Sequence, residues 1–82
     1  MTHQEVKNEI AQKSLAVAVK QAMWFELEMT FNAIQRLTGV HMKTVTSHVY
    51  AKQGSNVRPW AKRTNEQKRE AVELAQKLIN IR

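Results

Sequence analysis

The chain has 82 residues, of which 43% are hydrophobic and 24% charged, so it fits one small folded domain and is too apolar for a disordered tail. It has no cysteine, which excludes disulfides, thiolate metal sites and cysteine nucleophiles. Two glycines and one proline are too few for the many turns of an all-β protein. We therefore expect a single all-α domain.

The N-terminal region gives no sign of a membrane or export segment. Met1 leads into a polar, acidic stretch, whereas a signal peptide begins with basic and then apolar residues. No apolar run approaches the roughly 20 residues that span a bilayer. We expect a cytoplasmic protein with no membrane partner.

Residues 4–27 predict one long N-terminal helix, because they are rich in Ala, Glu, Lys and Gln and contain no glycine or proline. Ile10, Val17 and Trp24 recur every seven residues along one stripe. Residues 15–25, which begin with Leu15 and end with Phe25, are apolar over more than one face. Such a helix usually contacts two partners, and the second is either another part of this chain or a second subunit.

The positive charge is concentrated in the middle of the chain. Residues 30–63 carry six bases and no acid, whereas residues 1–29 sum to −1 and residues 64–82 to +1, so the middle holds the whole net charge of +6. A polyanion is the expected partner of such a block, and a solvated basic face is the alternative.

Residues 30–52 read as two short helices joined by a sharp turn. Thr30 is a good N-cap for the first helix. Gly39 ends it, because glycine adopts a positive φ without a Cβ clash. The second helix is expected to start at residue 41 or 42 and to turn Val45 and Val49 inward, with Val40 filling the angle between the helices.

The segment AIQRLTGVHMKTVTSHV resembles the helix-turn-helix signature of bacterial and phage DNA-binding proteins. The residues that match the signature at its spacing are Ile34, Gly39, Val40, Thr44, Val45, His48 and Val49. Two positions differ from it, because Gln35 stands where a small alanine is usual and His41 where a serine cap is usual. The resemblance spans residues 30–50 and is at the superfamily level. It implies that the second helix reads double-stranded DNA in the major groove.

Geometry then assigns DNA contacts to the outward side chains of this region. The residues expected to contact bases are His41, Met42, Lys43, Thr46, Ser47 and Tyr50. Those expected to contact phosphates are Thr30, Arg36, Thr44, His48, Lys52, Arg58, Lys62 and Arg63.

Residues 53–63 form a basic loop. Pro59 biases Arg58 toward extended backbone, so residues 53–62 are a candidate wing or arm whose arginine enters a minor groove or pairs with phosphate. The alternative is a plain connector between helices. We expect Trp60 to be a hydrophobic lid under the last helix and not a platform for stacking bases.

Residues 64–81 predict the C-terminal helix. Thr64 and Gln67 have the spacing of a capping box, in which each side chain satisfies an N–H of the first turn. One face of this helix is apolar, and its members are Ala71, Leu74, Ala75, Leu78 and Ile81.

The residues do not predict an enzyme. Ser47 and His48 are neighbours on a helix, so their side chains diverge by about 100° and do not pair as nucleophile and base. His41 and His48 are about 10 Å apart along the helix axis, too far to share a metal. We expect no metal, no cofactor and no small-molecule substrate.

We therefore expect a sequence-specific DNA-binding protein of the bacterial cytosol or nucleoid, a small transcriptional regulator of the phage, plasmid or mobile-element kind. An architectural or excisionase-type DNA binder and a protein-binding adaptor on the same scaffold remain alternatives. A homodimer is expected, because one recognition helix reads only a half-site. Its contact would be residues 15–25, or the C-terminal stripe of Leu74, Leu78 and Ile81, unless these two helices simply pack on each other.

Overall fold

The computed structural model describes residues 2–52 and 55–81. Within these residues there are α-helices and one short 3-10 helix but no β-strand, so the expected all-α fold is confirmed. In chain order the elements are α1 (His3–Gln12), α2 (Ala16–Phe25), α3 (Phe31–Thr38), α4 (Met42–Tyr50), η1 (Trp60–Lys62) and α5 (Asn65–Asn80). No helix in this described part is long and apolar enough to cross a membrane.

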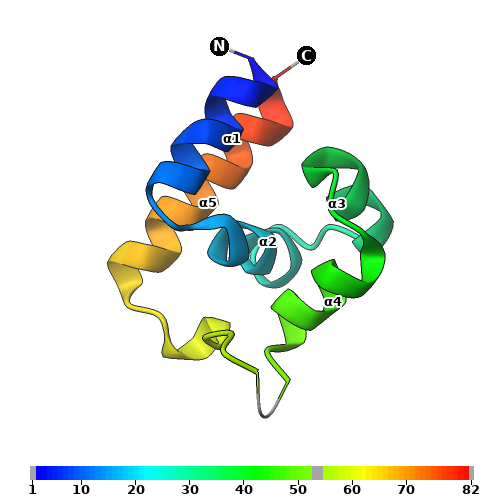
Figure 1. The fold of residues 1–82 in the computed structure, drawn as a ribbon. Coiled ribbons are helices and arrows are strands. Elements are labelled where there is room, and N and C mark those ends of the chain that lie inside the picture. Colours follow the sequence, from blue (N-terminus) through cyan, green and yellow to red (C-terminus); the bar gives the residue numbers. More distant parts are fainter. Residues whose placement is uncertain (1, 53–54, 82) are drawn as a thin grey trace.

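Helix α2 is the centre of the molecule. It packs against α5 on one side and against α3 and α4 on the other, while α1 runs beside α5 with both chain ends at the same end of the molecule (Figure 1). Residues 18–23 are all buried, and they include the polar side chains of Lys20 and Gln21. The second partner expected for the apolar stretch of residues 15–25 is thus found within this chain.

The prediction of one continuous helix over residues 4–27 is wrong, because the chain breaks between α1 and α2. Ser14 adopts a left-handed φ of 57°, and the Leu15 amide donates to the Ile10 carbonyl at 3.0 Å. The Ser14 amide donates to the Ala11 carbonyl, which completes a Schellman motif. Leu15 and Ile10 are both buried. The break lets α1 fold back along α5 and bury its own apolar side chains, which a straight helix would leave in solvent.

Helix α5 closes the other side of the core. Its capping box is present as predicted, since the Gln67 amide donates to Thr64 Oγ1 and the Thr64 amide donates to Gln67 Oε1, both at 3.1 Å. The predicted inward face is buried except for the last member, Ile81, which is half-buried. Two ion pairs then join α1 to α5, Lys13 to Glu70 at 2.7 Å and Lys77 to Glu9 at 3.7 Å.

Candidate nucleic-acid interface

Helix α3 and the turn after it are built as the sequence predicts. Thr30 Oγ1 accepts a hydrogen bond from the Ala33 amide at 3.1 Å, which caps the helix, and Ile34 is fully buried beneath it. Gly39 ends the helix with a φ of 73°, the left-handed region that favours glycine. The chain thus reverses sharply before α4 begins at Met42.

Helix α4 is anchored by one face and presents the other to solvent. Val45 and Val49 are buried against the core, as predicted. His41 caps the helix, since its Nδ1 accepts from the Lys43 amide at 3.1 Å. An imidazole thus takes the place of the usual serine cap. His41, one of the predicted base contacts, is exposed and uses one ring nitrogen to cap the helix.

The remaining predicted base-contacting residues of α4 differ in their exposure to solvent. Lys43 and Tyr50 are exposed, while Met42, Thr46 and Ser47 are half-buried. The Thr46 hydroxyl donates to the Lys43 carbonyl at 3.0 Å, so only its methyl group and oxygen lone pairs are left for a ligand.

Three aromatic rings in contact, those of Tyr50, Phe31 and Trp24, form a column beside the C-terminal end of α4. The ring of Tyr50 meets that of Phe31 edge-on at 5.8 Å, and Phe31 stacks on Trp24 at 4.0 Å. These contacts fix the side of α4 on which the phenol lies while leaving Tyr50 55% exposed. The column also ties α4 to α3 and to the central helix α2.

The predicted phosphate contacts divide into exposed and engaged side chains. Those exposed to solvent are Thr30, Arg36, Thr44, Lys52, Arg58 and Lys62. Arg63 is instead half-buried, and its Nε donates to Gln21 Oε1 at 2.7 Å. Burial, with a smaller contribution from the nearby charge of Arg58, lowers the pKa of Arg63. Arg63 therefore positions the loop, and its predicted contact with phosphate would require it to leave Gln21.

His48 also faces the protein more than the solvent. It is half-buried, and its Nδ1 has no hydrogen-bond partner within the described residues. Burial, with a smaller contribution from Lys20, lowers the pKa of its imidazole, so the ring is neutral at pH 7. A neutral, half-buried ring attracts phosphate less than an exposed cation does, and the predicted phosphate contact of His48 stays a prediction.

Gln21 joins α4 to the basic loop, a role that the sequence analysis did not assign. Its side chain is fully buried, and Nε2 donates to the carbonyls of His48 and Arg58 at 2.9 Å and 2.8 Å. With the bond accepted from Arg63, one side chain from α2 holds the end of α4 and both sides of Pro59. The signal was the presence of two polar residues, Lys20 and Gln21, inside an apolar stretch.

The loop after α4 has no β-wing in its described part. Residues 55–62 contain no strand, and the last three of them form the 3-10 helix η1, while residues 53 and 54 of the predicted wing lie outside the described residues. Trp60 is only 8% exposed and donates from Nε1 to Glu26 Oε1 at 3.4 Å. It is thus the predicted hydrophobic lid, and its burial explains why η1 packs on α2 instead of projecting as a hairpin.

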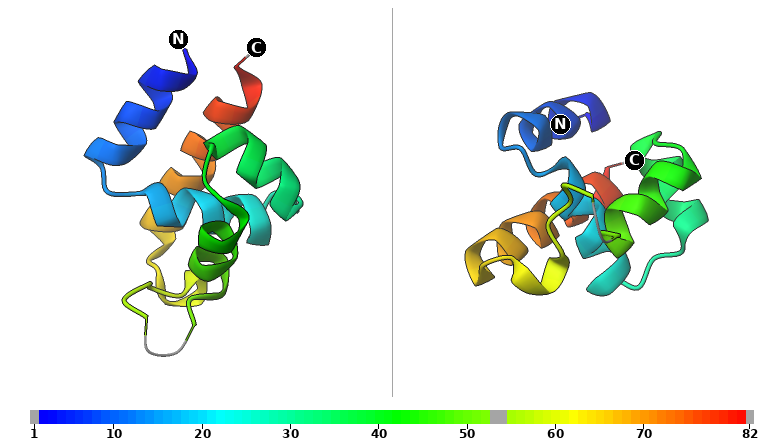
Figure 2. Two further views of the ribbon diagram at one scale, coloured as in Figure 1. Left: turned by 45° about the vertical axis from the view of Figure 1, so that its right-hand side comes forward. Right: turned by 60° about the horizontal axis from the view of Figure 1, so that its bottom comes forward.

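Charge is segregated between the two sides of the fold. The acidic residues lie on α1, on α5 or in the first residues after α2 (Glu26 and Glu28), whereas α3, α4 and the loop up to residue 63 carry only bases. Figure 2 shows that α4 leads to the end of the molecule opposite the two chain ends. A polyanion that contacts α3, α4 and the loop would therefore meet bases and no acid on these elements.

Comparisons of the chain with protein-family models, with curated proteins and with solved structures found no match.

Proposed function

We propose that this protein binds double-stranded DNA in a sequence-specific way, with α4 in the major groove, and acts as a small transcriptional regulator of the phage, plasmid or mobile-element kind. Its place of action would be the bacterial cytosol or nucleoid. Binding would need no cofactor or metal. An architectural role in bending DNA would use the same surface.

One observation carries the proposal: α4 has a polar outer face, is anchored through Val45 and Val49, and lies within a segment that bears the entire net charge. A helix fits the major groove, and Lys43, which is exposed on α4, would donate to guanine O6 or N7. Ser47, one turn further along α4, is a short hydrogen-bonding group suited to a base edge. The exposed bases on α3 and the loop, chiefly Arg36, Lys52 and Arg58, would set the register on phosphates.

The test is a selection of bound sequences from a random duplex pool with the wild type and with Lys43→Ala/Ser47→Ala. We expect the wild type to enrich a defined sequence and the variant to lose that preference, because one good base contact contributes about 1–3 kcal/mol of discrimination. The matched control is Arg69→Ala/Gln76→Ala, which removes the same side-chain classes from the exposed surface of α5 and should keep the wild-type preference.

The salt dependence of binding separates this function from the adaptor alternative. If the chain binds duplex DNA, the logarithm of its association constant should fall linearly with the logarithm of the salt concentration. The reason is that basic side chains displace counterions from the phosphates they contact. A chain that shows no affinity for any duplex at low salt would instead be a protein-binding adaptor, and its basic surface would serve an acidic protein.

We further propose that DNA is bound by a two-fold dimer, because one helix reads only a half-site. Both stretches expected to make the dimer contact have members that are already buried within one chain, namely Leu15 of the first and Leu74 and Leu78 of the second. Among the described residues outside α4, the exposed large apolar side chains are Phe25 and Ile79. Two shallow hollows that share Met29 lie between these two side chains, and we propose this surface as the dimer contact. The other apolar residues that line the hollows are Trp24, Phe25, Ala33, Leu37 and Ile79.

A further inference from the structure

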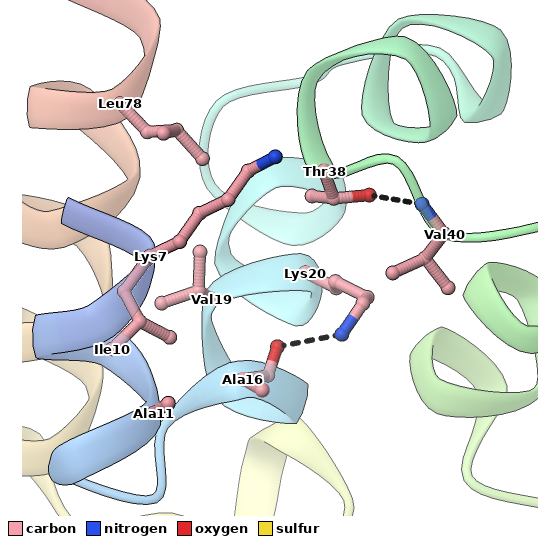
Figure 3. Close-up of a pocket in the computed structure, with 9 residues that line it drawn as sticks. All are labelled: Lys7, Ile10, Ala11, Ala16, Val19, Lys20, Thr38, Val40 and Leu78. Carbon is pink, nitrogen blue, oxygen red and sulfur yellow. Dashed lines mark hydrogen bonds between the residues drawn. The ribbon is translucent and has the colours of Figure 1, made fainter. Parts of the chain in front are cut away.

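A cavity of about 200 Å³ lies between α1, α2 and the turn that joins α3 to α4. Apolar side chains from all of these elements and from α5 line it, and they include Ile10, Val19, Val40 and Leu78. Two lysines and one threonine supply its polar groups (Figure 3). Since an apolar cavity of about 150 Å³ holds benzene, this one has room for a ring with a small polar substituent.

Lys20 makes this cavity electrostatically unusual. The side chain comes from the centre of α2, is only 5% exposed, and has its ammonium bonded to the Ala16 carbonyl at 3.0 Å. No carboxylate of the described residues lies within ion-pair distance of it, since the carboxylates that form ion pairs contact Lys13 and Lys77. An ammonium buried with a single carbonyl is costly, and an apolar side chain of the same shape would be more stable there.

Lys7 adds a second positive charge to the same wall. It reaches across from α1, and its Nζ lies 3.9 Å from where a Cβ on Gly39 would be. The carboxyl end of α3 offers this ammonium partial negative charge, but Lys20 has no such compensation. Figure 3 shows the Lys7 side chain extending from α1 toward Thr38, and the Lys20 side chain turned back toward the Ala16 carbonyl. Lys20 is thus a buried ammonium with no acidic side chain of the described residues beside it.

We propose that this cavity binds a small organic monocarboxylate with an apolar body of about the size of a benzene ring. The carboxylate would accept a hydrogen bond from the Lys20 ammonium group, the Lys7 charge would add attraction from the α1 side, and the body would lie against Val19, Val40 and Leu78. A neutral analogue would leave the buried ammonium without a counter-charge, and a cationic analogue would be repelled, so the charge of the ligand decides binding. This binding requires only the fold and is independent of the proposed DNA-binding function.

The probe is benzoate, compared with benzyl alcohol and benzylamine at matched ionic strength. A ligand at about ten times its Kd raises the melting temperature of a domain this size by roughly 5–10 °C. We expect that shift from benzoate and none from the alcohol or the amine. Equal shifts from benzoate and benzyl alcohol, or none from benzoate up to solubility, would overturn the proposal.

Two variants locate the site. Lys20→Met should abolish the benzoate shift while raising the melting temperature of the free protein, whereas Lys77→Met, which removes the same charge from exposed α5 outside this cavity, should keep the shift. NMR of the wild type provides a reading that does not depend on how a variant folds. Benzoate should move the methyl signals of Val19, Val40 and Leu78, and movement confined to other methyl groups would refute the assignment.

Discussion

Replacing Gln21 with leucine tests whether one buried side chain holds α4 and the basic loop in place. The change keeps the size of the side chain but removes two bonds to carbonyls and one bond from Arg63. Net contributions are about 0.5–1.5 kcal/mol for each bond between neutral groups and about 1.5–3 kcal/mol for a bond from a charged donor. The added apolar burial returns about 1–2 kcal/mol, so we expect a net loss of about 2–4 kcal/mol in the free energy of unfolding.

Urea denaturation followed by circular dichroism measures this loss, with the midpoint falling at an unchanged slope. The matched control is Gln76→Leu, an exposed position on α5, which should change the free energy of unfolding by less than about 0.5 kcal/mol. If Gln21→Leu also stays within that range, the three bonds contribute nothing net, and the reasoning about this side chain is refuted.

Three further predictions concern the turn, pH and assembly. Gly39→Val should cost about 1–3 kcal/mol of stability by thermal melting, because a β-branched residue is strained at a φ of 73°; an unchanged melting temperature would contradict this. Burial and Lys20 lower the pKa of His48, so the unfolded chain binds the proton at higher pH than the folded one, and stability should fall as pH drops below about 6.5. Urea midpoints at about pH 7.5 and 5.5 should differ less in His48→Gln than in the wild type, and equal differences would exclude this linkage. Sedimentation at micromolar concentration should give a dimer that Phe25→Ser/Ile79→Ser dissociates, and a mass staying near 9.5 kDa for the wild type would rule the dimer out.

The parts of the fold that the sequence predicted are those determined by neighbours in the chain. Thr30, Gly39 and Thr64 act on backbone groups within a few residues, so the ends of α3 and the start of α5 can be read locally. The alternation of Val45 and Val49 with polar residues likewise places the inner and outer faces of α4.

The parts that could not be predicted depend on contacts between distant residues. Nothing near Ser14 is a strong helix breaker, and α1 separates from α2 because packing along α5 compensates for a left-handed serine. The role of Gln21 required knowing that residues 18–23 of α2 are buried all round, since its partners are 27 to 42 residues away. The same burial hides the uncompensated charge of Lys20, which periodicity alone would place on a surface.

The position of α5 also determines when the domain folds during synthesis. This helix leaves the ribosome after every other element, yet Ala71, Leu74 and Leu78 cover the side of α2 that faces away from α3 and α4. Residues as distant as His3 and Ile81 then come within 3.2 Å. A nascent chain that has exposed only residues 1–63 therefore lacks four of the fifteen buried core residues, and we expect it to remain sensitive to proteases. Resistance should appear in one step when α5 emerges, so that α4 acquires a rigid support only as synthesis of this segment finishes.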